Sequence, residues 1–267
     1  MSADNFLLSH WQREVESLKK HLRKFSTERI EVIHKFRINI KKLRAYLRLY
    51  LLISKRKTDR ELFVETEKLF SVLGDHRNME LNKSHANKIF PENKELAIAF
   101  VTLLDNFQSG LGVDSILKDY EPSGLDELTE VMEETMRNKD SETLMDEISG
   151  INNHYLKKAK KHMLHFAQNF HQIRKELKTI FYLSKISFPA AGFSKTDLDR
   201  LEEILSLLGE IQDREVTSDL LHKFHGSVKN EWEKHVVDRS INRIVLKKEE
   251  ELVKVQKMAG VFLEERS

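Results

Sequence analysis

Apolar residues recur every three or four positions along most of this chain, which is the period of one face of an α-helix. The first run of this kind covers residues 6–25. Its apolar positions are Leu7, Trp11, Val15, Leu18 and Leu22. The sequence contains no persuasive run of alternating apolar and polar residues, the pattern of a half-buried strand. The pattern therefore predicts an all-α protein.

Capping residues, prolines and glycines divide this pattern into separate helices. Ser26-Thr27 can cap a second helix that runs to about Ile53, because hydroxyl oxygens accept hydrogen bonds from the first N–H groups of a helix. Later breaks fall at Phe90-Pro91, at Ser109-Gly110-Leu111-Gly112 and at Phe188-Pro189. We predict helices over residues 6–25, 28–53, 58–74, 94–107, 151–186, 195–225 and 228–263.

A short pattern occurs twice in the sequence. Its copies are His34-Lys35-Phe36-Arg37 with Lys41, Arg44 and Tyr46, and His171-Gln172-Ile173-Arg174 with Lys178, Phe181 and Tyr182. A Leu-Gly motif follows each copy, as Leu73-Gly74-Asp75-His76-Arg77-Asn78 and as Leu208-Gly209-Glu210-Ile211-Gln212-Asp213. The histidines are 137 residues apart and the glycines 135. Two signals at nearly one offset predict an internal duplication, and so an all-α protein built from two bundles.

We expect these bundles to form one domain over residues 1–267. The first half covers about 1–112 and the second about 149–267. The stretch between them, about 113–148, is acidic and is predicted to connect the halves with perhaps one helix of its own, since Glu121-Pro122-Ser123-Gly124 interrupts it.

Composition excludes several classes of protein. The chain has 267 residues, 33% of them charged, with only 9 Gly and 3 Pro, which favours long helices and few turns. It has no Cys, which excludes a disulfide scaffold, a thiolate zinc site and a cysteine nucleophile. The N-terminus does not read as a secretory signal, and no run approaches the ~18 apolar residues of a membrane span. We therefore expect a soluble cytoplasmic protein with no membrane contact.

Charge is segregated along the chain although the net charge is only +2. Ten basic residues lie between Val32 and Arg60, where Asp59 is the only acid. Twelve acidic residues lie between Asp114 and Glu147, against three basic ones. Such segregation indicates a partner of one sign, here an anion.

On a helix the basic residues of each copy fall on one face, next to an apolar face that points to the core. Like charges one turn apart destabilise a helix, so an uninterrupted row of cations is better explained by an anionic ligand than by stability. Two such rows would suit a long polyanion, because Arg and Lys bind phosphate oxygens. The candidate binding residues are His34, Arg37, Lys41, Lys42, Arg44, Arg48, Arg77, His171, Arg174, Lys175 and Lys178.

Structural explanations of the same residues stay open. A basic face is usually a solvated face, and His34 and His171 can be packing residues or can pair with Asp213 and Asn78. The Leu-Gly motifs can mark close helix packing. Metal binding is poorly supported, because each copy has one histidine and no Glu-x-x-His. Nucleotide-binding glycine motifs and the Gly-x-Ser-x-Gly elbow are missing from the sequence. The tyrosines Tyr46, Tyr50 and Tyr182 lie in apolar stretches and are expected in the core.

The paired motifs resemble those of the CHAD domain, the "conserved histidine α-helical domain", over nearly the whole chain. Each half of that domain has a pattern like His-x-x-Arg-x-x-x-Lys/Arg-x-x-Arg, followed by Leu-Gly-x-x-Arg/Gln-Asp. Two positions depart from it: Asn78 replaces an acid, and Phe181 stands where the second half often has Arg. We expect the second basic surface to be the weaker one for this reason.

The resemblance implies two pseudo-symmetric four-helix bundles that bind inorganic polyphosphate through basic side chains, without catalysis, cofactor or metal. It also allows association with polyphosphate granules. CHAD domains are often fused to a β-barrel CYTH-type domain, and with no strands predicted we expect a stand-alone binding module. Two alternatives stay open: an RNA- or DNA-binding protein that uses the same face, and a phosphohydrolase or phosphotransfer protein that uses His34 or His171. Oligomeric state is not indicated by the sequence.

Overall fold

The structure, a computed structural model, describes residues 6–23, 29–137, 139, 141–187 and 192–266. Every regular element in these ranges is a helix, so the all-α prediction is confirmed. The elements divide between two compact units. The first unit comprises residues 1–74, 113–158 and 175–199, and the second comprises residues 75–112, 159–174 and 200–267. Each unit contains residues from both predicted sequence halves, so the compact units do not coincide with those halves.

Helices from three separate stretches of the chain form the first unit. It contains α1 (Phe6–Arg23), α2 (Arg29–Ser54), the 3₁₀ helix η1 (Lys57–Phe63), α5 (Val113–Asp119) and α6 (Ser123–Met136), with parts of α3 (Val64–Ile89), α7 (Ser141–Met163), α8 (Phe166–Ile186) and α9 (Lys195–Ser227). Side chains of α1, α2 and η1 fill its core, and the largest are Trp11, Phe36, Ile40, Leu43, Tyr50 and Phe63. Burial raises the pKa of Tyr46 to about 12, which confirms this tyrosine and the fully buried Tyr50 as core residues.

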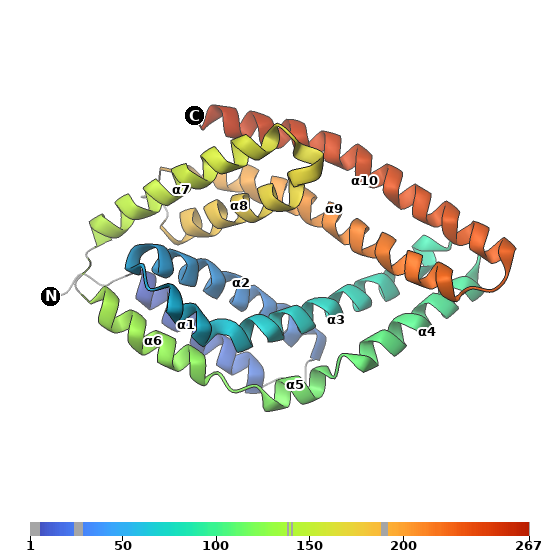
Figure 1. Cartoon of the computed structure of the whole chain (residues 1–267), viewed down its shortest axis with the longest axis horizontal. Coiled ribbons are helices and arrows are strands. Elements are labelled where there is room, and N and C mark those ends of the chain that lie inside the picture. Colours follow the sequence, from blue (N-terminus) through green and yellow to red (C-terminus); the bar gives the residue numbers. More distant parts are fainter. Residues whose placement is uncertain (1–5, 24–28, 138, 140, 188–191, 267) are drawn as a thin grey trace. The chain divides into compact units, whose positions relative to one another are not determined.

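The acidic stretch is part of this core and not only a connection. Figure 1 shows α6 beside α1. The Trp11 indole Nε1 donates a hydrogen bond of 2.8 Å to Thr129 Oγ1 on α6, and Lys19 pairs with Asp126 at 2.5 Å. Four buried α6 side chains complete the packing: Leu125, Leu128, Met132 and Met136. The expectation of a single helix in this stretch was wrong, since α5, α6 and the start of α7 lie here.

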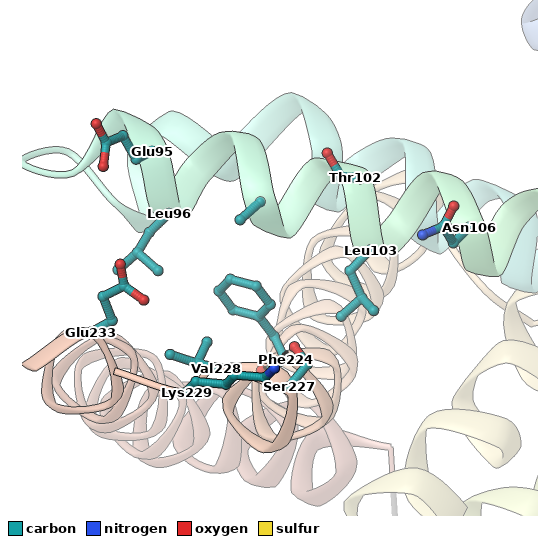
Figure 2. Close-up of a pocket in the computed structure, with 11 residues that line it drawn as sticks. Glu95, Leu96, Thr102, Leu103, Asn106, Phe224, Ser227, Val228, Lys229 and Glu233 are labelled. Carbon is teal, nitrogen blue, oxygen red and sulfur yellow. Dashed lines mark hydrogen bonds between the residues drawn. The ribbon is translucent and has the colours of Figure 1, made fainter. Parts of the chain in front are cut away.

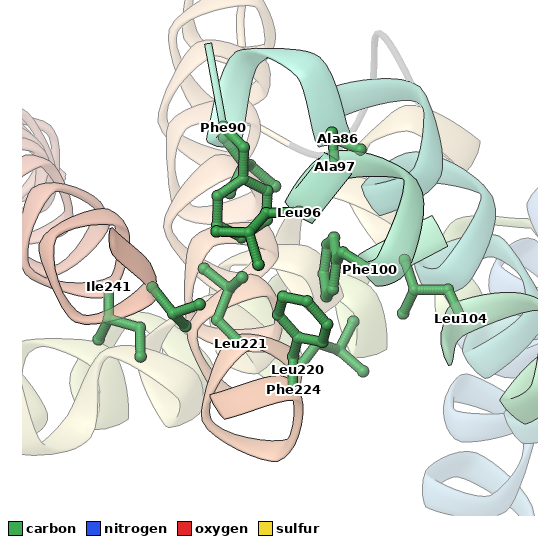
Figure 3. Close-up of a cluster of buried hydrophobic side chains, with 12 residues drawn as sticks. Ala86, Phe90, Leu96, Ala97, Phe100, Leu104, Leu220, Leu221, Phe224 and Ile241 are labelled. Carbon is green, nitrogen blue, oxygen red and sulfur yellow. The ribbon is translucent and has the colours of Figure 1, made fainter. Parts of the chain in front are cut away.

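Three aromatic rings form the centre of the second unit's core (Figure 3). Phe90 follows α3, Phe100 lies on α4 (Lys94–Gly110) and Phe224 lies on α9, with ring centroids 5.3–5.9 Å apart. Val237 and Ile241 on α10 (Glu231–Glu265) pack against the same cluster. Aromatic pairs at this separation add to the stability gained from burial alone.

Helices α9 and α10 form an antiparallel hairpin (Figure 1). Ion pairs join the two helices at increasing distance from the turn. Residue numbers fall along α9 and rise along α10 from pair to pair, as antiparallel helices require. The pairs are His225–Asp238 at 3.4 Å, Arg214–Glu251 at 2.6 Å and Arg200–Glu265 at 2.5 Å. The hydrogen bonds that Arg214 donates to Glu251 raise the pKa of the Arg214 guanidinium.

Some helix boundaries differ from the predicted ones. The predicted helix 58–74 is η1 followed by α3, which continues through Gly74 to Ile89. The predicted helix 151–186 is two helices, because α7 ends at Met163 and α8 begins at Phe166. No Gly or Pro marks the break between Met163 and Phe166 in the sequence. The predicted helices 94–107, 195–225 and 228–263 are confirmed within a few residues.

One described segment, residues 94–119, is long and apolar enough to cross a membrane by length and composition alone, with a mean hydropathy of 1.4. It is interrupted near Gly112, which has a φ of +58° between α4 and α5. Its inner face supplies Leu96, Ala97, Phe100 and Leu104 to the core of the second unit. The segment thus packs through one face, and the absence of a membrane span stays a prediction.

We expect Phe100→Ala to destabilise the protein by about 3–5 kcal/mol, because it removes a fully buried ring from the aromatic cluster. Ile98→Ala on the same helix is the matched control, since that side chain is 67% exposed and should cost far less. Chemical denaturation of both variants measures the difference. Equal losses would show that Phe100 does not pack as the structure has it.

Candidate anion-binding surface

Helix α2 carries the first row of cations and has the two faces that the sequence predicts. Phe36, Ile40, Leu43 and Leu47 are buried. On the adjacent face His34, Arg44 and Arg48 are exposed, while Arg37 and Lys41 are half-buried. A packed wall thus supports the cations from behind.

Arg37 packs against α3 at the Leu-Gly motif of the same half. Its Nη1 donates a hydrogen bond of 2.8 Å to the carbonyl of Phe70, and its guanidinium lies 4.4 Å from the centre of the Phe70 ring. A Cβ added to Gly74 would lie 2.7 Å from Nη1. Gly74 therefore leaves space for the arginine inside a continuous helix, and the motif marks close packing and not a turn.

The second half repeats this arrangement with a looser fit. Arg174 on α8 lies next to Gly209 on α9, and a Cβ on Gly209 would lie 3.7 Å from Arg174 Nη2. In each half, the arginine of the first motif thus approaches the glycine of the second. This explains why the two motifs occur as a pair.

Acidic side chains from neighbouring helices neutralise part of the α2 row. Glu67 on α3 lies 3.3 Å from both Arg44 and Arg60. Lys42 turns away from the row and pairs with Glu14 on α1 at 2.8 Å. No acid interrupts this row along the sequence, but acids from α1 and α3 lie beside it in the folded protein.

Arg48 lies where α2 approaches α8. Its guanidinium donates a hydrogen bond to the hydroxyl of Thr179, and it lies 5.7 Å from the centre of the Tyr155 ring on α7. Lys175 and Lys178 belong to the same compact unit and lie on the same helix as Thr179, and Lys175 is exposed. Thr179 in turn donates to the carbonyl of Lys175 at 2.9 Å. Lys175 and Lys178 of the second row therefore lie in the same unit as the α2 row, whereas His171 and Arg174 belong to the second unit.

Two candidate residues of the second unit, Arg77 and His171, contact acids of α9. Arg77 makes a bidentate pair with Asp213, at 2.6 and 3.0 Å. His171 lies 2.7 Å from Glu215. Of the structural explanations left open by the sequence, His171 thus pairs with Glu215 and not with Asp213. His34 is exposed and makes no hydrogen bond or ion pair to any residue that the structure describes.

The structure places the two departures from the repeated motif as follows. Asn78 Oδ1 lies 3.4 Å from Arg77 Nη1, beside the Arg77–Asp213 pair. Phe181 is buried in the first unit, with Lys185 Nζ 5.1 Å from its ring centre. Phe181 thus lies in the packed side of α8.

A cavity of about 440 Å³ in the second unit does not suit an anion (Figure 2). Its floor is apolar and includes Leu96, Leu103 and Phe224. Glu95 and Glu233 border it with a single cation, Lys229. Among the described residues, no group of three or more His, Asp or Glu side chains is arranged to hold a metal ion.

The sequence reasoning missed residues on α7. Tyr155 was not a candidate, but it contacts Arg48. Residues 148–175 contain no acid at all, a signal as clear as the one used for residues 32–60. Lys157, Lys158 and Lys161 lie in this stretch and are exposed.

Comparisons with known proteins agree with the repeated motifs. The CHAD domain family model matches residues 6–222. The chain belongs to the CHAD domain family. The crystal structure of the CHAD domain from the plant Ricinus communis is similar to this CHAD protein with a TM-score of 0.76 and 15% identity, over 97% of this chain and 92% of that one. At this identity the likeness shows the fold. No curated protein matches the chain.

We expect Gly209→Ala to stabilise this CHAD protein by up to about 1 kcal/mol, because alanine is the better helix former and its Cβ makes only an ordinary contact. Gly74→Ala should stabilise the protein by about 1 kcal/mol less than Gly209→Ala does, because the new Cβ displaces Arg37 from the Phe70 carbonyl. Denaturation of both variants, and of Gly74→Ala in an Arg37→Ala background, tests this. The deficit should vanish in that background. A deficit that persists without Arg37 would contradict the contact.

Proposed function

We propose that this CHAD protein binds inorganic polyphosphate without catalysis. The observation that carries the proposal is the contact of Arg48 on α2 with Thr179 on α8, inside the compact unit that also holds Lys175 and Lys178. A linear polyanion can contact both rows at once. Arg48 contacts a hydroxyl and an aromatic ring, so its charge remains available to a phosphate.

Electrostatics would drive this binding. Each phosphate that a cation neutralises releases counterions, so affinity should fall as salt rises, as it does for nucleic acids. Charge-assisted hydrogen bonds from arginine and lysine add to this term. More phosphates engage more of the two rows, so affinity should also rise with chain length.

Arg48→Ala combined with Lys175→Ala should weaken binding of long-chain polyphosphate at least tenfold, since a hydrogen bond to a charged group contributes about 1.5–3 kcal/mol. Titration at low and at raised salt measures the loss. Lys254→Ala combined with Lys257→Ala removes the same charge from exposed positions of α10 and should have little effect. Unchanged affinity in the first variant, with the fold intact, would overturn the site.

Two further functions remain as alternatives to test in the same experiments. An RNA-binding protein would lose polyphosphate when RNA is added, whereas a polyphosphate site should retain it. A phosphohydrolase would release phosphate in a screen of divalent metals. A phosphotransfer protein would form acid-labile phosphohistidine at His34 or His171. We expect none of these three results.

Glu67 should lower the affinity for polyphosphate, because it holds Arg44 and Arg60 at 3.3 Å and must be displaced by phosphate. We expect Glu67→Gln to bind polyphosphate several-fold more tightly than the wild type, with the largest gain at low salt. Glu65→Gln is the control, since Glu65 is exposed and pairs with Lys68 outside the row. The same gain in both variants would show a general charge effect and no competition at Arg44.

A further inference from the structure

Helix α7 carries a third row of cations that the repeated motifs do not include. His154, Lys157, Lys158 and Lys161 are all exposed. Their spacing of three and four residues places them on one face of this continuous helix. We call these four residues the α7 row.

The α7 row is not neutralised by the protein. Lys157, Lys158 and Lys161 make no ion pair with any residue in the described ranges. In contrast, Lys42, Arg44, Arg77 and His171 each face a carboxylate. The sequence offers no acid between Glu147 and Glu176 to relieve the repulsion.

The helix dipole explains only part of this row. Cations in the last turn of a helix are stabilised by the partial negative charge of its free carbonyls. That applies to Lys161, near the end of α7 at Met163. Lys157 and Lys158 lie beyond the reach of this effect, which is confined to the last turn. Their unrelieved repulsion needs another explanation, and an anionic ligand supplies one.

Tyr155 joins the α7 row to the surface formed by α2 and α8. Its ring centre lies 5.7 Å from the guanidinium of Arg48 and 5.8 Å from Lys158 Nζ. A cavity of about 460 Å³ opens here between the end of α2 and α7. Leu52, Ile53 and Ile151 form its apolar part, and His154, Tyr155 and Lys158 line the rest. Glu147 also borders this cavity, but Lys139 pairs with it at 3.0 Å and offsets its charge.

We propose that the α7 row is an additional subsite for inorganic polyphosphate, reached only by chains long enough to extend past Arg48 and Tyr155. This inference rests on the proposed function and adds chain-length selection to it. Short chains occupy the rows of α2 and α8. Longer chains continue onto α7, where three more cations engage them and raise the affinity through effective concentration.

The test compares two triple variants that remove equal charge. Lys157→Ala, Lys158→Ala and Lys161→Ala together remove the α7 lysines. The control is Lys247→Ala, Lys254→Ala and Lys257→Ala, three exposed lysines of α10. Each variant and the wild type are titrated with triphosphate and with long-chain polyphosphate at one salt concentration, and thermal unfolding checks that both variants fold.

We expect the α7 variant to lose at least tenfold in affinity for long chains and less than threefold for triphosphate, while the control loses neither. Equal losses for both ligands, or equal losses in both variants, would overturn the subsite. If the wild type does not bind long chains, the proposed function itself fails. If the wild type binds and the α7 variant matches it, only the subsite fails.

Discussion

The packing of the Arg37 guanidinium on α3 is the contact on which the basic surface depends. The guanidinium lies against the Phe70 ring and carbonyl, in the space left by Gly74. This contact fixes the rotation of α2, because the charged row and the buried row are held at a constant angle on one helix. Once Arg37 faces α3, Phe36 and Ile40 enter the core and Arg44 and Arg48 remain accessible. An arginine that stacks and donates to a carbonyl thereby organises packing that an apolar side chain of similar volume could not specify.

The protein treats its cations in two ways. Some are held by carboxylates from other helices, as with Arg77 by Asp213 and Arg44 by Glu67. Others contact only hydroxyl or aromatic groups, as with Arg48 and Lys158. Exposed ion pairs contribute little to stability. Their main effect is that the carboxylates compete with an anionic ligand for the same cations. Binding strength on such a surface is thus set as much by where the acids lie as by the number of basic residues.

Much of the fold could be predicted from sequence, because helical periodicity is a local signal. The faces of α2 follow from Phe36, Ile40 and Leu43 alone. Partners across helices were not predictable, since nothing local connects Glu67 to Arg44 or Glu215 to His171. The break between α7 and α8 was missed because Leu164 and His165 carry no turn signal. The predicted helix ended at Gly74, but Gly74 lies within α3, where its small size matters and its backbone freedom does not.

Four helices, α3, α7, α8 and α9, contribute residues to both compact units. At four of its five crossings between the units the chain runs within one of these helices, and at the fifth it passes through the break at Gly112. Unfolding one unit would leave its neighbour with frayed helix ends and unsatisfied carbonyl and N–H groups, which are costly when shielded from water. Loss of order in one unit is therefore transmitted to the other along the helices themselves. The consequence is mechanical: the protein should yield to heat or denaturant as a single cooperative body, although its cores are separate.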